Sequence, residues 1–209
     1  MPLHSTFNYK SNIRVSVWDI TESVPDLAVS SLTQKSHQRL EGMKSMVHQK
    51  GFLSIRKLLE ASGYTDSDLY YHETGKPLLT DGVQVSITHS AQYSALALAE
   101  VPVGIDIEHV KPVVGRIAHK FTKNEAWFLD ATAADYLDKL TVIWGVKEAI
   151  FKVVNEPGIS FNHHIAVSEF SLDDQETTAM LDFNGQQTGF TIYFESIAAY
   201  KLVVATYIS

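Results

Sequence analysis

Two acidic residues stand two positions apart in the apolar stretch Val103-Gly104-Ile105-Asp106-Ile107-Glu108. In a β-strand alternate side chains share a face, so Asp106 and Glu108 should project together, about 7 Å apart. On a solvent-facing strand such a pair does nothing. In a cleft, repulsion between the two carboxylates raises their pKa values unless a cation neutralises them. Carboxylate oxygens without nearby cysteine suit Mg²⁺, so the pattern suggests a magnesium site.

A second chemical pattern lies about 40 residues later, where Glu148 precedes Lys152 by one helical turn. Side chains four apart are neighbours on a helix surface. The simplest interpretation is an exposed ion pair worth about 0.3–0.5 kcal/mol. The same spacing would also direct a metal-binding or proton-accepting carboxylate and a phosphate-binding ammonium at one site. Lys147 lies nearer the apolar stripe of this helix and is expected to extend its ammonium to the surface.

Positive charge is concentrated in residues 35–57, where six basic residues accompany a single acid. This segment could hold an anion, although charge runs are more often solvated helix faces. The chain as a whole carries a net charge of −7, which argues against a nucleic-acid partner.

The elements that must position these residues are predicted from the spacing of apolar positions. In the first half we expect a strand at 14–19, a helix at 35–61 and strands at 83–88 and 93–99. In the second half we expect a strand at 103–108, helices at 124–130 and 135–155, and strands at 165–172, 189–195 and 198–208. Gly63 and Pro157-Gly158 would end the two long helices.

Both halves therefore combine helix with mostly antiparallel sheet, which predicts an α+β fold. We expect a pseudo-twofold duplicate with an N-terminal half at residues 1–101, a C-terminal half at 102–209, and the active site between them.

Bulk composition narrows the class of protein. With 209 residues, 45% of them hydrophobic, the chain can bury a substantial core. It contains no cysteine, which fits a reducing compartment. No stretch approaches the roughly 18 apolar residues of a membrane helix, and the first residues lack a secretion signal. We therefore expect a cytoplasmic protein with no membrane partner.

The two chemical motifs occur in an order that resembles the signature of the phosphopantetheinyl transferase superfamily. Its strand motif corresponds to residues 104–108, and its helix motif to Trp144-Gly145-Val146-Lys147-Glu148-Ala149-Ile150-Phe151-Lys152. Further resemblance lies in Gly75-Lys76-Pro77, Val85-Ser86-Ile87-Thr88-His89-Ser90, Lys120–Glu125 and Pro157–Phe161. Gly145 departs from the pattern, because serine, threonine or alanine is common there.

The length and the two halves resemble the large monomeric, surfactin-synthetase-activating type. The resemblance implies transfer of 4'-phosphopantetheine from coenzyme A to a serine of an acyl or peptidyl carrier protein, releasing 3',5'-ADP. Mg²⁺ would be held by Asp106, Glu108 and Glu148. Asp106, Glu148 and Lys152 would be catalytic, with Glu148 the candidate base. Coenzyme A would contact the following residues: Arg56, Lys76, Thr88, His89 and Lys152.

Two other functions remain open on the sequence. A catalytically silent homologue could bind coenzyme A in the same cleft, although the intact acidic residues and Lys152 argue against decay of the site. A magnesium-dependent phosphohydrolase would use the same carboxylates but would leave the stretches around Lys76 and His89 unexplained.

Overall fold

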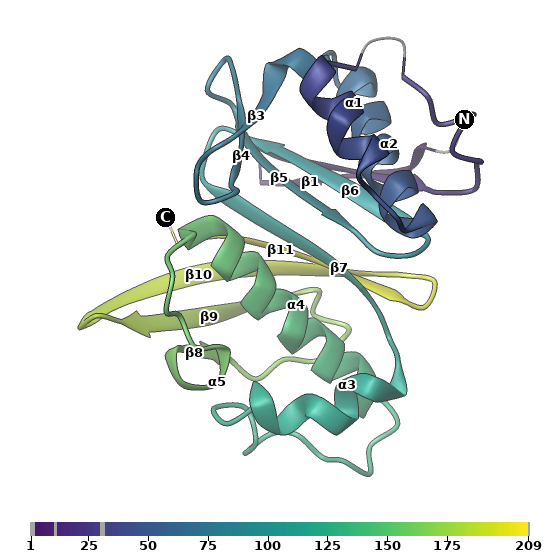
Figure 1. Ribbon diagram of the computed structural model, residues 1–209. Coiled ribbons are helices and arrows are strands. Elements are labelled where there is room, and N and C mark those ends of the chain that lie inside the picture. Colours follow the sequence, from purple (N-terminus) through teal and green to yellow (C-terminus); the bar gives the residue numbers. More distant parts are fainter. Residues whose placement is uncertain (1–2, 11, 30–31, 209) are drawn as a thin grey trace. The chain divides into compact units, whose positions relative to one another are not determined.

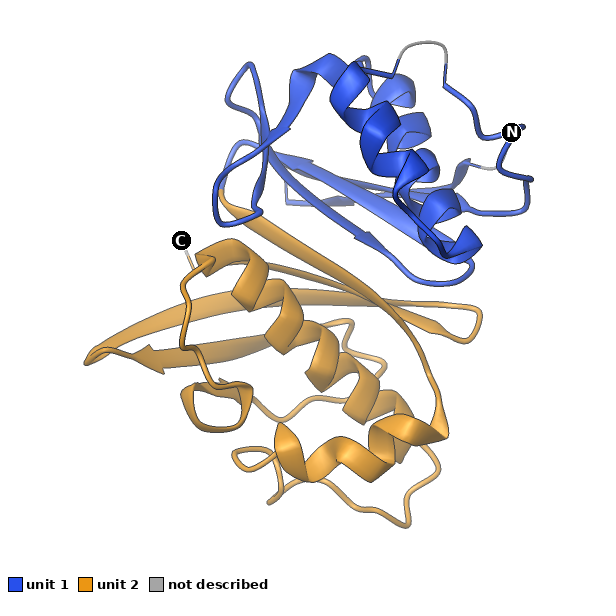
Figure 2. Cartoon of the chain, in the orientation of Figure 1, with its two compact units in different colours: residues 1–101 blue, residues 102–209 orange. Residues whose placement is uncertain are grey.

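The chain forms two compact units, Met1–Val101 and Pro102–Ser209, coloured separately in Figure 2. The structure is a computed structural model, and it describes residues 3–10, 12–29 and 32–208. None of the helices in these ranges has both the length and the apolar character required to span a membrane.

Unit 1 is built on an antiparallel sheet with the strand order β1-β2-β6-β5 (Figure 1). Its described elements follow the chain in this order: β1 (Leu3–Tyr9), β2 (Ile13–Asp19), α1 (Gln34–Glu41), α2 (Met46–Ala61), the 3₁₀ helix η1 (Asp66–Asp68), β3 (Leu69–Tyr71), β4 (Pro77–Leu79), β5 (Gln84–His89) and β6 (Tyr93–Ala99). Leucine and isoleucine side chains of α2 pack with Trp18, Val85 and Leu96 of the sheet in one core. β3 and β4 form a separate hairpin.

The expected single helix at 35–61 is two helices. α1 ends at Gly42, whose backbone N–H donates to the carbonyl oxygens of Gln38 and Leu40, and α2 starts after Ser45. Glycine and serine favour such termini over a helix interior. At the other end of α1, the Thr33 side chain accepts a hydrogen bond from the Ser36 N–H.

Unit 2 is an antiparallel sheet with the order β7-β11-β10-β9-β8, and α4 runs along one of its faces (Figure 1). Its described elements are β7 (Val103–His109), α3 (Pro112–Ile117), the 3₁₀ helix η2 (Ala118–Lys120), α4 (Tyr136–Val154), α5 (Phe161–His164), β8 (Ile165–Val167), β9 (Glu176–Phe183), β10 (Gln186–Ile197) and β11 (Tyr200–Tyr207). The buried stripe of α4 consists of positions three or four apart, namely Leu140, Ile143, Val146, Ile150 and Val153.

Two expectations for unit 2 are wrong. Residues 124–128 form turns and residues 129–130 have no regular structure, so no helix forms in this stretch. Two side-chain contacts stabilise this conformation. Asn124 Nδ2 donates a hydrogen bond to the Ile165 carbonyl oxygen, and Glu125 forms a buried ion pair with Lys147. The strand expected at 165–172 ends at Val167. The α+β class is correct. The pseudo-twofold duplication is not confirmed, because the two sheets differ in strand number and strand order.

Candidate functional site

The acidic strand β7 turns Gly104 and Asp106 toward α4. Gly104 lies against Ala149 of that helix, and Asp106 contacts Lys152. Alternation along the strand puts Glu108 on the same face as Asp106. Ile105 and Ile107, on the opposite face, are also almost fully buried. β7 is therefore not a solvent-facing strand, and that alternative is wrong for Asp106, which is 5% exposed.

Two glycines allow α4 to approach the sheet closely. A Cβ atom at Gly104 would overlap the carbonyl oxygen of Ala149. A Cβ atom at Gly145 would lie 2.8 Å from Cγ2 of Val203 on β11, and 3.8 Å from Oδ2 of Asp106. A side chain at position 145 would therefore force Val203 to shift, and Gly145, which departs from the family pattern, avoids this clash beside the acidic strand. This close contact brings the face of α4 that carries Glu148 and Lys152 to Asp106.

Lys152 binds the acidic strand. Its Nζ lies 2.8 Å from Asp106 Oδ1 and donates a second hydrogen bond of 2.8 Å to the carbonyl oxygen of Ile105. The lysine side chain is 29% exposed and that of Asp106 only 7%. The simple helix-surface pair of Glu148 with Lys152 is therefore replaced by an ion pair between helix and strand.

The three carboxylates influence one another strongly. Burial raises the pKa of Glu108 to about 7, with further contributions from the charges of Asp106 and Glu148. Burial, followed by repulsion from Asp106, also raises the pKa of Glu148. Lys152 opposes both shifts. Lys111 also opposes the shift of Glu108, so three carboxylates face two ammonium groups in this region.

The donor set fits a hard divalent cation, which binds carboxylate oxygens and would remove this repulsion. Within the described ranges, no three histidine or acidic side chains already stand close enough together to hold an ion. A single ion would therefore have to draw the carboxylates of Asp106, Glu108 and Glu148 closer together.

The pKa of Glu108 predicts how stability depends on pH. A carboxyl group whose folded pKa is raised from 4.5 to about 7 makes the unfolding free energy fall as the pH rises through that window. Glu108→Gln should abolish this fall. After allowance for partial exposure, we expect the variant to be about 1–2 kcal/mol more stable than the wild type at pH 8, and equal to it near pH 4.5.

Urea unfolding in EDTA across this pH range measures the difference. Glu169→Gln, at an exposed position of the same unit, is the control and should follow the wild type. Equal stability of Glu108→Gln and wild type at pH 8 would mean that Glu108 is not under electrostatic strain.

Sequence reasoning missed the role of Lys147. Its side chain is fully buried rather than extended to the surface, and its Nζ lies 2.9 Å from Glu125 Oε1. The ammonium also donates to the carbonyl oxygens of Phe121, Phe161 and Ile165. Burial raises the pKa of Glu125 and lowers that of Lys147, and their mutual attraction opposes both shifts. The glutamate was visible in the sequence only as part of a resemblance, with no sign that it pairs with Lys147.

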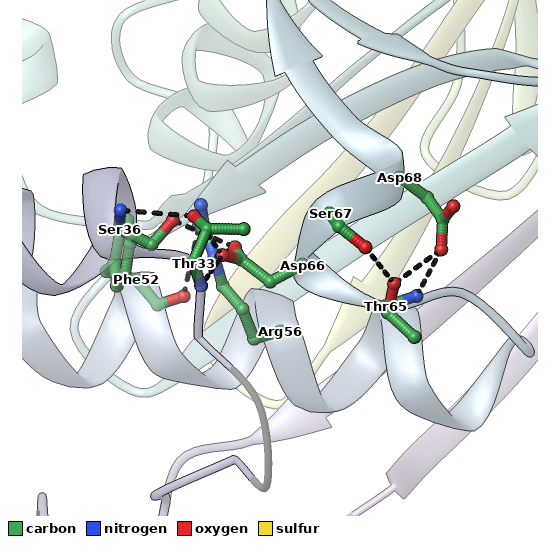
Figure 3. Close-up of polar contacts among 8 residues, drawn as sticks. All are labelled: Thr33, Ser36, Phe52, Arg56, Thr65, Asp66, Ser67 and Asp68. Carbon is green, nitrogen blue, oxygen red and sulfur yellow. Dashed lines mark hydrogen bonds and ion pairs between the residues drawn. The ribbon is translucent and has the colours of Figure 1, made fainter.

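Arg56, in unit 1, is only 3% exposed and is therefore not a solvated surface residue. Figure 3 shows its contacts with Asp66 and Phe52. Its Nε donates to Asp66 Oδ1 at 2.9 Å, Nη1 donates to the Phe52 carbonyl, and the guanidinium stacks 3.6 Å from the Phe52 ring centroid. Asp66 also accepts hydrogen bonds from Thr33 and Ser36. Arg56 therefore ties α2 to the start of α1 and to η1.

A cavity of about 300 Å³ in unit 1 combines cationic and aromatic groups. Its lining includes Arg39, His48, Phe52, Arg56, Tyr71 and His89. Such a mixture suits a nucleotide, whose base stacks on rings and whose phosphates attract guanidinium groups. Among the predicted ligands, the cavity brings together Arg56 and His89.

His89 is seated directly on the backbone of α2. A Cβ atom at Gly51 would lie 2.6 Å from Cγ and Nδ1 of the His89 ring. The His48 ring meets it edge-on, with centroids 6.1 Å apart. Thr88, one residue earlier on β5, points to the other face of the sheet. Lys76 does not line this cavity, and burial lowers its pKa.

Comparisons with known proteins identify the family of the chain. Residues 102–207, just over half of the chain, match the 4'-phosphopantetheinyl transferase superfamily. The chain belongs to this superfamily.

Three individual relatives are each described as a 4'-phosphopantetheinyl transferase. The chain is 26% identical over 148 residues to 4'-phosphopantetheinyl transferase gsp of Aneurinibacillus migulanus, covering 68% of this chain and 60% of the relative. It is 28% identical to psf-1 of Bacillus pumilus, covering 63% and 57%. It is 32% identical to Sfp of Bacillus subtilis (strain 168), covering 49% of each. The chain thus matches less than two thirds of the length of these relatives.

Proposed function

We propose that this protein transfers the 4'-phosphopantetheine group of coenzyme A to a serine of an acyl or peptidyl carrier protein and releases 3',5'-ADP. The observation that carries the proposal is the electrostatically coupled charge cluster of Asp106, Glu108, Glu148 and Lys152 on β7 and α4, in a segment that matches the superfamily.

In the proposed reaction, the serine oxygen attacks the β-phosphorus of coenzyme A. A new P–O bond forms to serine, the bond from the β-phosphorus to the bridging oxygen breaks, and 3',5'-ADP leaves. Such transfers are accelerated mainly by positioning and by neutralising charge on the phosphate oxygens. Glu148, directly or through water, accepts the serine proton, because its carboxylate belongs to the cluster around Asp106.

Asp106, Glu108 and Glu148 are the residues that would hold Mg²⁺. When bound, the ion supplies positive charge to the pyrophosphate oxygens. Lys152 contributes a second positive charge to the same phosphates. The repulsion among the three carboxylates supports this assignment, because it is relieved by a divalent cation.

The cavity in unit 1 is the proposed binding site for the nucleotide part of coenzyme A. His89 and Arg56 line it and would contact phosphate groups. Lys76 and Thr88 belong to the same proposal on the resemblance alone. The proposal also includes a monomeric state and a cytoplasmic location.

The direct test is incubation of the protein with coenzyme A, Mg²⁺ and a panel of unmodified carrier proteins, read by intact mass. We expect one phosphopantetheine on the carrier serine. Formation of 3',5'-ADP without any carrier would favour the phosphohydrolase, and coenzyme A binding without turnover would favour the silent homologue.

Substitution of the acidic residues tests the site. Asp106→Asn and Glu148→Gln preserve shape but remove charge, and each should lower turnover by about 100-fold or more. Asp135→Asn, an acidic residue whose exposed ion pair with Lys139 lies at the start of α4, is the control and should keep normal turnover. Near-normal activity of Asp106→Asn would remove Asp106 from the metal site.

A further inference from the structure

Lys201, on β11, is a buried charged residue that the proposed reaction does not use. Its side chain is only 7% exposed, and its Nζ lies 2.7 Å from Oδ1 of Asp138 in the first turn of α4. The ammonium also donates a 2.8 Å hydrogen bond to Ser196 Oγ on β10. One lysine therefore joins two neighbouring strands of the unit 2 sheet to the start of α4.

Lys201 lies in the same cross-strand row as Glu108 of the candidate site. The two residues are paired in the register of β7 and β11, and Val203 is paired with Asp106 in the same way. Paired residues on neighbouring antiparallel strands share one face of a sheet. Lys201 therefore extends toward α4 from the face that carries the acidic residues, and it pairs with the helix although Glu108 is its neighbour across the strands.

Two other contacts of α4 with these strands involve glycine. Gly104 on β7 meets Ala149, and Gly145 of the helix meets Val203 on β11. These contacts bring the backbones close together, but the apolar packing around them is non-directional. An ion pair is directional, because a shift of a few ångströms along the helix axis breaks it. Fixing the register of packed elements is the best-attested role of buried polar pairs.

The register of α4 matters for the candidate site because one continuous 19-residue helix carries Asp138, Glu148 and Lys152. Glu148 lies ten residues after Asp138, or about 15 Å along the helix axis. A displacement of the helix at Asp138 therefore also moves Glu148 relative to Asp106 on β7. Misplacement of a reacting group by about 1 Å can lower turnover by about 100-fold.

We propose that Lys201 is a positioning residue whose ion pair with Asp138 fixes the register of α4 on the sheet. The pair thereby holds Glu148 and Lys152 beside Asp106. The expected effect on turnover rests on the proposed function. The register itself can be measured without any reaction.

Disulfide formation measures the register directly, because the chain contains no cysteine of its own. A Cβ atom at Gly145 would lie 3.3 Å from Cβ of Val203, close to the range of about 3.5–4.5 Å found in disulfides. Gly145→Cys combined with Val203→Cys should therefore form a disulfide under mild oxidation, read by intact mass after alkylation of the remaining thiols. Adding Lys201→Met should slow its formation about fivefold or more, whereas Lys201→Arg, which keeps the charge, should not.

Turnover supplies the second measurement, on proteins without the added cysteines. At a temperature at which circular dichroism shows the variant folded, Lys201→Met should lower kcat about tenfold or more, with the KM for coenzyme A within about twofold of wild type. Lys201→Arg should retain most of the activity. Asp138→Asn should cause a similar loss, and combining it with Lys201→Met should cost no more than one substitution alone, since both break the same pair.

Lys139→Met is the matched control, because it breaks an ion pair between α4 and Asp135 at its own start rather than a pair to the sheet. It should leave both measurements unchanged. Unchanged disulfide formation in Lys201→Met, even with reduced stability, would overturn the positioning role. Failure of the disulfide to form in otherwise wild-type protein would overturn the register on which that role depends. The expected disulfide rates without any transfer activity would refute the proposed function and support the positioning role alone.

Discussion

Replacing Lys147 by methionine is expected to lower the unfolding free energy by about 3–5 kcal/mol, the range for removing one partner of a buried ion pair. Methionine fills a similar volume, so the loss comes from charge rather than from a cavity. Glu125, which is completely buried, would keep a carboxylate with no cation beside it. The carbonyl oxygens of Phe121, Phe161 and Ile165 would lose their common donor.

Urea unfolding followed by circular dichroism measures this loss. Lys139→Met breaks an exposed pair on the same helix and should cost no more than about 1 kcal/mol. Combining Lys147→Met with Glu125→Gln should recover part of the stability, because the unpaired carboxylate is removed. A loss below about 1 kcal/mol for Lys147→Met would mean that this network does not hold the turns at 121–125 to α4.

Arg56→Ala is expected to destabilise unit 1 by about 3 kcal/mol. Burial raises the pKa of Asp66, but hydrogen bonds from Thr33, Ser36 and Arg56 outweigh it and hold the pKa below 3.8. Because this folded pKa is depressed, the contribution is present at neutral pH and is lost as the pH falls below that value. The variant leaves Asp66 its hydroxyl and backbone donors but no cation.

Thermal unfolding at pH 7 and pH 3 measures the stabilising role of Arg56, and coenzyme A affinity measures any role in binding. Lys57→Ala, on the same helix with an only partly buried pair, is the control and should change stability by less than about 1 kcal/mol. If Arg56 also contacts the 3'-phosphate, the variant should bind coenzyme A more weakly by about 1.5–3 kcal/mol. Its loss of binding free energy for dephospho-coenzyme A, which lacks that phosphate, should be smaller. Unchanged stability at pH 7 would refute the structural role.

The sequence predicted the acidic strand and the helix of the candidate site because both follow simple periodicity. Alternation along β7 and a four-residue step along α4 are local rules, and the resemblance joined the two motifs. The partner of Lys152 was not predictable in this way, since Asp106 lies 46 residues away in the sequence. Periodicity predicts that Lys152 pairs with Glu148 on the same helix, whereas in the structure it pairs with Asp106 on β7.

The remaining errors have the same origin. Glu125 and Lys147 are 22 residues apart, and each looks like an ordinary surface charge until the fold buries them together. Arg56 belongs to a run of basic residues that resembles a solvated helix face, yet Asp66 draws it inward. The stretch 124–130 contains residues compatible with a helix, but the side chains of Asn124 and Glu125 bind partners elsewhere in unit 2.

The contact of Gly104 with Ala149 has a consequence for engineering this protein. The spacing between β7 and α4 is set by two backbones rather than by adjustable side chains, since no side chain fits at position 104. A library randomised at that codon should return glycine alone, whereas Ile105, on the opposite face, should accept other apolar residues. If the unit 1 cavity binds coenzyme A as proposed, altered substrate preference is therefore more readily sought among the residues that line it, where a change of side chain does not displace the acidic strand.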